Sequence, residues 1–211
     1  MPWLMATIYD RIMRRSEALC LNQWRADLLH DLRGAVLEVG AGTGVNLAHY
    51  PPTVSRLVLV EPDRHMRQRL ELRCRSTGLS DVEIWPDPLE ELRVPPASFD
   101  AVVATLVLCS VPDLPTTLQQ IVDLLRPGGR LVFLEHVAAE GNPRRLRWQG
   151  RLEPLWRRVA GNCHLTRRTE GAILRTGLLM ERIERASIRK APPFVRPSIR
   201  GIARKPGPEA A

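Results

Sequence analysis

Three glycines, each separated from the next by one residue, follow a short apolar segment near the start of the sequence. Residues 36–39 lead into a turn that consists of Gly40, Ala41, Gly42, Thr43 and Gly44 and is closed by Asn46. Glycine adopts positive φ angles and lets another molecule lie directly on the backbone. The pattern therefore predicts a strand that runs into a ligand-binding turn at the carboxyl end of a parallel sheet.

An acid inside this segment restricts the chemistry of the ligand. Glu38 would repel the pyrophosphate of a dinucleotide, whereas it would attract a cation. The string also lacks the third glycine of the dinucleotide-binding fingerprint, because Val45 and Leu47 stand where it would fall. A positively charged ligand that carries an adenosine fits these residues better.

A second acid ends the next apolar segment. Residues 56–61 end in Glu61, and a carboxylate at the end of a strand can accept hydrogen bonds from both hydroxyls of a ribose. Pro62 and Met66 follow closely enough to flank an adenine ring, although a methionine at the position of Met66 more often serves helix packing. The glycine turn and this acid together predict a nucleoside site.

Strand and helix patterns alternate along the rest of the chain, which predicts a doubly wound α/β fold with a mainly parallel sheet and right-handed crossovers. One or two amphipathic helices are expected within residues 1–33. The expected strands are residues 35–39, 56–61, 82–85, 99–106, 130–135, 179–188 and 194–204, and the expected later helices are 63–76, 114–125, 144–158 and 166–176. We expect one domain over residues 1–205, with a helical segment at 144–178, and a disordered tail at 206–211.

The formal net charge of +8 is concentrated in the second half, where residues 144–205 hold 17 basic and four acidic residues. Such asymmetry suggests an anionic partner, and solvated arginines explain it as well. The four cysteines and five histidines are scattered without a Cys-x-x-Cys pair, so we expect free thiols in a reducing cytoplasm and no metal site. Neither a signal peptide nor a spanning helix is expected. We therefore expect a cytoplasmic protein that could touch an anionic membrane peripherally.

The order of these motifs resembles class I S-adenosylmethionine (SAM) methyltransferases. Besides the glycine turn and Glu61, the resemblance rests on residues 98–100 before one apolar strand and residues 125–129 before the next. It implies a Rossmann-like fold with a seven-stranded sheet and helices on both faces, SAM as methyl donor and S-adenosylhomocysteine as product. The donor contacts that it implies, besides those above, come from Asp87, Pro88, Leu89, Thr105 and Leu106. Pro88 stands where the family usually has an acid.

A narrower resemblance covers nearly the whole chain. Residues 105–111, 135–140, 161–167 and 195–201 look like the methyltransferase-like seven group, whose animal members methylate alkyl thiols and carry a hydrophobic amino-terminal anchor that is not seen at the start of this sequence. A small-molecule acceptor, most simply a thiol, is implied. Positioning of donor and acceptor, at Thr105, would then supply most of the rate. His136 could orient or deprotonate the acceptor, or be structural.

Other residues and other functions stay open at this point. Cys109 is interpreted as a packed thiol, while Trp148, Trp156, Cys163 and His164 are expected to cover the acceptor pocket. A phospholipid N-methyltransferase, of the phosphatidylethanolamine type, is the main alternative, because residues 8–10 resemble such enzymes and the second half is basic. A non-catalytic SAM-binding module is a further alternative. Nucleic acid is disfavoured as a partner, because only two Tyr and three Phe are available for stacking. The oligomeric state is left undetermined.

Overall fold

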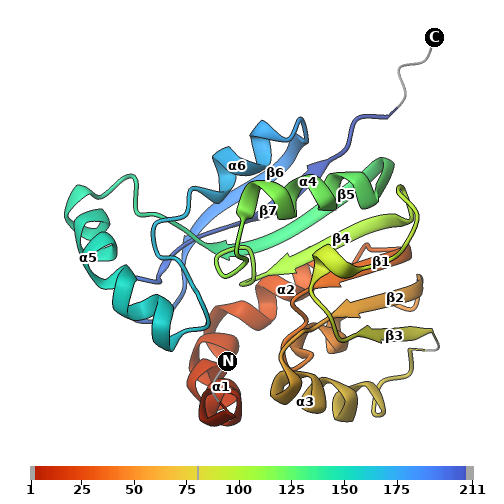
Figure 1. Cartoon of the computed structure of the whole chain (residues 1–211), viewed down its shortest axis with the longest axis horizontal. Coiled ribbons are helices and arrows are strands. Elements are labelled where there is room, and N and C mark those ends of the chain that lie inside the picture. The colour runs from red at the N-terminus through yellow and green to blue at the C-terminus, as the bar shows by residue number, and fades with distance from the viewer. Residues whose placement is uncertain (1–2, 80, 208–211) are drawn as a thin grey trace.

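The computed structural model describes residues 3–79 and 81–207, so most of the tail expected to be disordered lies outside the described residues. Seven strands form one sheet in the order β3-β2-β1-β4-β5-β7-β6 (Figure 1). The strands are β1 (Gly34–Val39), β2 (Val54–Val60), β3 (Val82–Trp85), β4 (Phe99–Thr105), β5 (Leu125–His136), β6 (Leu179–Ser187) and β7 (Pro197–Arg204).

The first five strands pair in parallel, and β7 runs antiparallel to both β5 and β6. Helices connect the parallel strands and cover both faces of the sheet (Figure 1). The prediction of a Rossmann-like α/β fold with a mainly parallel seven-stranded sheet is confirmed. Because parallel strands end at the same edge, the residues after β1, β2, β4 and β5 meet there.

Alternate residues of the central strands face opposite sides of the sheet, and each side has its own apolar core. Val36, Leu57 and Val103 pack on the side of α2 (Asn22–Leu29) and α3 (Arg64–Cys74). Leu37, Val58 and Val102 pack on the other side, with α4 (Leu114–Leu124) and α6 (Thr169–Arg175). The continuous apolar runs of these strands follow from burial on both faces.

The remaining helical segments lie at the start of the chain, in short turns after strands, and in one long helix. The chain begins with α1 (Trp3–Ser16), and a π-helical turn, η1 (Glu17–Leu21), leads from it into α2. Short 3₁₀ turns follow β1 and β3, as η2 (Val45–His49) and η3 (Leu89–Glu91). The long helix α5 (Pro143–Val159) projects beyond the sheet (Figure 1).

Most predicted boundaries agree with the structure within a few residues, and β5 differs most. We expected this strand at residues 130–135, but it begins at Leu125, where the preceding helix ends. Leu125 pairs with Phe99 and Arg130 with Ala101, so Arg126-Pro127-Gly128-Gly129 forms an irregular bulge within the pairing. The first part of the strand could not be predicted from the sequence, because proline and glycine usually indicate turns.

Gly201 provides a test of the packing at the antiparallel edge. A Cβ on Gly201 would lie 2.1 Å from the carbonyl oxygen of Arg182 and 2.9 Å from the ring of Phe133. We expect Gly201→Ala to lower the free energy of unfolding by roughly 1–3 kcal/mol, as overpacking does. Gly141→Ala is the control, because a Cβ there would have no neighbour within 4 Å in the part of the chain that the structure describes. Urea unfolding of both variants measures the difference, and equal stability would contradict this account.

Candidate active site

The three glycines of the turn have different tasks, although all three have positive φ angles. A Cβ on Gly40 would lie 2.3 Å from Cγ2 of Val107, and one on Gly44 would lie 2.7 Å from Cδ1 of Leu70, so both positions are closely packed by the protein itself. Among the described residues, a Cβ on Gly42 would meet only the carbonyl oxygen of Gly40, at 4.0 Å. Gly42 is therefore the glycine whose exposed backbone is open to a ligand.

Glu61 is held beside that open glycine by backbone amides from two directions. Its Oε2 accepts a hydrogen bond from the Gly42 N–H at 2.7 Å, and its Oε1 accepts one from the Asp63 N–H at 2.9 Å. Burial raises the pKa of Glu61, and the two backbone hydrogen bonds oppose this. The carboxylate thus has a fixed orientation and retains acceptor capacity for hydroxyl groups.

The other residues expected near an adenine surround Glu61. Asp63 caps α3 by accepting from the amides of His65 and Met66, and Met66 is buried. The Glu61 N–H donates to the carbonyl of Trp85, which brings the end of β3 alongside. In the segment that follows β3, Leu89 is buried, whereas Asp87 and Pro88 are exposed, as is Pro62 after β2.

A buried polar network lies behind the glycine turn. Asn46 donates to Glu38 at 2.8 Å and to the hydroxyl of Thr105 at 3.0 Å. Arg25 of α2 donates to Asn46 Oδ1 at 2.8 Å and to Thr105 Oγ1 at 2.9 Å, and its charge is paired with Glu17. Arg25 was not among the predicted site residues, because a single arginine in an amphipathic helix gives no signal of burial.

Glu38 takes part in this network with both carboxylate oxygens. Besides Asn46, the hydroxyl of Tyr50 donates to it, at 2.7 Å. Burial raises the pKa of Glu38 to about 7, against the opposing hydrogen bonds of Tyr50 and Asn46. The expected attraction of Glu38 for a cation on the ligand stays a prediction, and in this structure the carboxylate orients Asn46 and Tyr50 behind the turn.

The loop after β4 has an unusual backbone that is fixed from β5. Leu106 has a φ of 56°, which is strained for a side chain of its kind, and such strain is typical of functional sites. Glu135 stabilises the loop by accepting hydrogen bonds from the amides of Val107, Leu108 and Cys109. Burial raises the pKa of Glu135 to about 7, although these amides oppose the rise.

His136 follows Glu135, and its buried side chain lies against Cys163. Its Nε2 lies 2.9 Å from Sγ of Cys163, to which Nε1 of Trp156 also donates, at 3.2 Å. Burial lowers the pKa of His136, but the hydrogen bond to Cys163 and the negative charges of Cys163 and Glu135 together raise it, and the net shift is upward. Hydrogen bonds from Cys109, His136 and Trp156 lower the pKa of Cys163 to about 4, against its burial. Its other ring nitrogen, Nδ1, is buried and has no hydrogen-bond partner among the described residues. The expected role of His136 as a base stays a prediction.

These residues fit an adenosine-containing sulfonium donor. The open backbone of Gly42 can receive a ligand, the adjacent Glu61 can accept ribose hydroxyls, and Thr105 stands at the end of the neighbouring strand β4. The geometry thus brings the predicted donor residues to one edge of the sheet, at the switch point between β1 and β4 where such folds bind ligands.

Comparison with known proteins identifies the family to which this fold belongs. Residues 9–172 match the family model of the methyltransferase domain. The thiol S-methyltransferase TMT1B of Rattus norvegicus is 34% identical over 177 residues, which cover 80% of this chain and 70% of the relative. The phosphatidylethanolamine N-methyltransferase of Cereibacter sphaeroides is 32% identical over 111 residues, 52% of this chain and 54% of that enzyme.

A solved S-adenosylmethionine-dependent methyltransferase from Mesorhizobium loti has the same fold, with a TM-score of 0.62 and 20% identity, over 90% of this chain and 98% of that one. The chain therefore belongs to the methyltransferase domain family and is a class I SAM-dependent methyltransferase. Its resemblance to the thiol S-methyltransferase group, first seen in short strings, extends over most of the sequence. SAM is its cofactor.

The pKa of Glu38 makes stability depend on pH in a specific direction. Its pKa is raised from 4.5 to about 7 in the folded state, so its protonated form favours folding. This contribution is complete below about pH 4.5 and is lost as the pH rises through 7. Glu38→Gln keeps the shape and removes the titration. We expect the free energy of unfolding of the variant, relative to that of the wild type, to rise by about 3 kcal/mol from pH 4.5 to pH 8.

Urea unfolding at several pH values measures this gain. Glu91→Gln is the control, because that carboxylate is exposed and lies on the surface turn η3. A stability difference between Glu38→Gln and wild type that stays constant from pH 4.5 to pH 8 would show that Glu38 does not titrate in this range.

Proposed function

We propose that this methyltransferase transfers the methyl group to the sulfur of a small thiol. The observation that carries the proposal is the 34% identity to a thiol S-methyltransferase over 80% of the chain. The phosphatidylethanolamine enzyme matches a shorter part, 52% of the chain. A thiol also suits the site chemically, because a thiolate is a strong nucleophile that needs little activation beyond loss of its proton.

The methyl donor would be held by groups that hydrogen bonds within the protein already orient. The backbone of Gly42 and the carboxylate of Glu61 would bind the nucleoside, and the network of Glu38, Asn46 and Tyr50 keeps the turn in shape. When bound, SAM supplies an electrophilic methyl group on a positively charged sulfur. The chain itself contributes position and exclusion of water, which account for most of the rate in such transfers.

Thr105 is suited to orient an anionic acceptor. Its Oγ1 accepts hydrogen bonds from both Arg25 and Asn46, so its acceptor capacity is used and its own proton is left for another partner. A thiolate held at the end of β4 could accept that proton in a hydrogen bond. Thr105 is therefore proposed as a positioning residue for the acceptor, with Arg25 and Asn46 fixing the direction of its O–H bond.

Donor binding is tested with two matched glycine substitutions. Gly42 and Gly177 both have positive φ angles, 60° and 82°, and a Cβ on Gly177 would have no neighbour within 4 Å among residues 3–79 and 81–207. Gly42→Ala and Gly177→Ala should thus suffer similar backbone strain, but only the first places a methyl group on the ligand surface. Calorimetry should show SAM binding lost or weakened at least tenfold in Gly42→Ala and retained in Gly177→Ala. Equal binding by both variants would contradict the donor site.

The acceptor proposal is tested by labelled methyl transfer to thiols, amines, phenols and phospholipids. We expect thiols to be methylated, with a rate that rises with pH as the thiolate fraction of the acceptor increases. Thr105→Val should reduce kcat/KM for the thiol by roughly 10–100-fold, the usual effect of losing a hydrogen bond to a charged group, while Thr105→Ser should retain most activity. Methylation of amines with thiols inert would overturn the thiol proposal.

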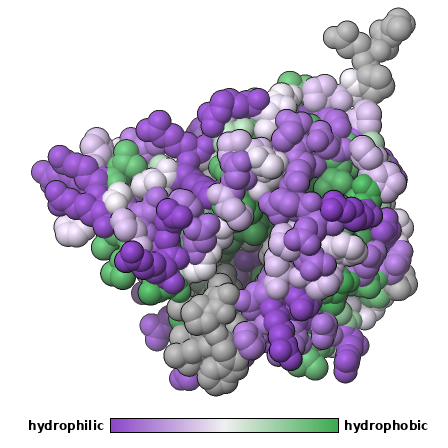
Figure 2. Space-filling view, viewed as in Figure 1, coloured by the Kyte–Doolittle hydropathy of each residue, from purple (hydrophilic) through white to green (hydrophobic). Residues whose placement is uncertain are grey.

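We further propose that α5 contacts an anionic membrane surface. Trp148, Leu152, Leu155 and Val159 recur at helical spacing, and Trp148 and Leu155 are 59% and 63% exposed. Exposed arginines flank this apolar stripe, at positions 144, 147, 151, 157 and 158. Figure 2 shows apolar side chains among hydrophilic ones on this projecting part of the molecule. A basic helix with an exposed apolar stripe is typical of proteins that lie in the membrane interface.

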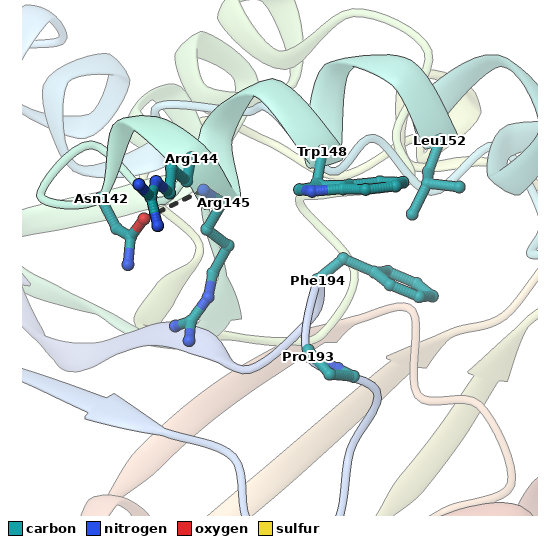
Figure 3. Close-up of a pocket in the computed structure, with 7 residues that line it drawn as sticks. All are labelled: Asn142, Arg144, Arg145, Trp148, Leu152, Pro193 and Phe194. Carbon is teal, nitrogen blue, oxygen red and sulfur yellow. Dashed lines mark hydrogen bonds between the residues drawn. The ribbon is translucent and has the colours of Figure 1, made fainter.

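A shallow groove extends the same surface. It is about 410 Å³ in volume and is lined by Arg144, Arg145, Trp148, Leu152, Pro193 and Phe194, together with Asn142. In Figure 3 the ring of Trp148 lies over Phe194, with the two arginines to one side. Within the described residues, no helix is long and apolar enough to cross a membrane.

Vesicle sedimentation tests this membrane contact. The wild-type chain should bind vesicles of anionic phospholipid better than neutral ones, and salt should weaken the binding. The double variant Trp148→Ala/Leu155→Ala should bind at least tenfold more weakly, because each side chain loses its burial in the interface. Leu72→Ala is the control, since Leu72 is 65% exposed on α3, away from this surface. Binding unchanged by the double variant would refute the role of α5.

A further inference from the structure

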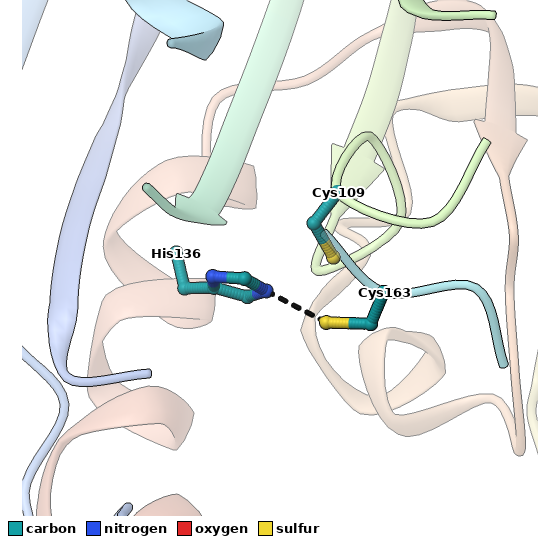
Figure 4. A group of neighbouring side chains, drawn as sticks. All are labelled: Cys109, His136 and Cys163. Atoms are coloured by element: carbon teal, nitrogen blue, oxygen red, sulfur yellow. Dashed lines mark hydrogen bonds between the residues drawn. The ribbon is translucent and has the colours of Figure 1, made fainter. Parts of the chain in front are cut away.

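Two cysteines and a histidine that are far apart in the sequence meet at the acceptor side of the sheet. Cys109 comes from the loop after β4, His136 ends β5, and Cys163 lies between α5 and α6. All three are buried, and their ligand-type atoms lie within 4.8 Å of one another (Figure 4). Nε2 of His136 is 2.9 Å from Sγ of Cys163.

We propose that Cys109, His136 and Cys163 bind a thiophilic divalent cation, with Zn²⁺ as the ion that fits best. Two sulfurs and an imidazole are donors that zinc prefers, whereas Mg²⁺ and Ca²⁺ prefer oxygen. Zinc bonds of about 2.3 Å to sulfur and about 2.0 Å to nitrogen place tetrahedral ligands roughly 3.5–4 Å apart. The donor atoms of the cluster lie within 4.8 Å of one another, and one pair is 2.9 Å apart, so their separations bracket that spacing.

The protein holds these ligands in place by contacts that do not involve an ion. The amide of Cys109 donates to Glu135, and the carbonyl of Cys109 accepts from the amide of His164. The segment of Cys163 is thereby tied to the loop of Cys109. Trp156 Nε1 donates to Sγ of Cys163, which is the kind of support that metal-bound thiolates receive from a surrounding shell.

Three ligands leave one position of a tetrahedral ion for a donor from outside the cluster, the arrangement found in catalytic rather than structural zinc sites. The cluster lies at the ends of β4 and β5, and Thr105 ends the first of these strands. The ion site rests on the three side chains alone and does not depend on the identity of the methyl acceptor. It departs from the expectation of no metal, which was based on spacing in the sequence.

Titration of the reduced, chelator-treated full-length chain with Co²⁺ under anaerobic conditions tests the proposal. We expect one Co²⁺ per chain, with a sulfur-to-cobalt charge-transfer band and the visible bands of a tetrahedral site, both removed by Zn²⁺. Cys163→Ser and His136→Ala should weaken Co²⁺ binding roughly 100-fold or more, since loss of even a supporting group weakens binding 10–100-fold. Cys74→Ser is the control, because Cys74 is a free cysteine outside the cluster and should leave binding unchanged.

Protection of the wild-type thiols gives a second measurement that does not depend on the folding of any variant. Zn²⁺ should slow alkylation of Cys109 and Cys163, mapped by mass spectrometry, and leave that of Cys74 unchanged. Absence of a charge-transfer band in the wild type, or equal alkylation with and without Zn²⁺, would overturn the proposal. So would a disulfide between Cys109 and Cys163 that forms readily in the presence of saturating Zn²⁺.

Discussion

The buried guanidinium of Arg25 links, through hydrogen bonds and an ion pair, three separate segments of the chain. A charge in the interior requires compensation by partners, since an unpaired one costs several kcal/mol. Glu17 pairs with its charge, and Asn46 and Thr105 accept its hydrogen bonds. These partners belong to the amino-terminal helices, the turn after β1 and the end of β4. The helices before the first strand are therefore part of the active-site wall.

Two carboxylates at the edge of the sheet accept hydrogen bonds from the backbone amides of the site's loops. Glu61 accepts hydrogen bonds from amides of the glycine turn and of the segment that leads into α3, and so fixes the backbone on the side of the methyl donor. Glu135 accepts hydrogen bonds from three successive amides of the loop after β4, and so fixes the backbone on the side of the methyl acceptor. In each case a strand end fixes the loop of a neighbouring strand. Charge-assisted hydrogen bonds of this kind stabilise loops that lack regular pairing.

The fold could be predicted, and candidate residues for the donor site could be named, because each has a local signature. Apolar runs mark the buried strands, and Gly40, Gly42 and Gly44 mark a turn that side chains would obstruct. The three glycines are alike in sequence, however, and only packing distinguishes the open Gly42 from the other two. Arg25 and the group formed by Cys109, His136 and Cys163 could not be predicted, because each depends on distant segments meeting in space. The resembling strings 105–111, 135–140 and 161–167 each contain one member of that group, which was the available signal.

The position of β7 in the sheet has a consequence for how the chain assembles. Among the described residues β7 is the last strand, yet it lies between β5 and β6, and β6 pairs with no other strand of that part of the chain. On a ribosome, β5 therefore keeps an open edge and β6 has no partner until residues 197–204 have emerged. Such long-range pairing slows folding and leaves a strand edge exposed to other chains. Shortening the chain by its final strand would release two strands rather than one, and truncation there should cause aggregation during synthesis.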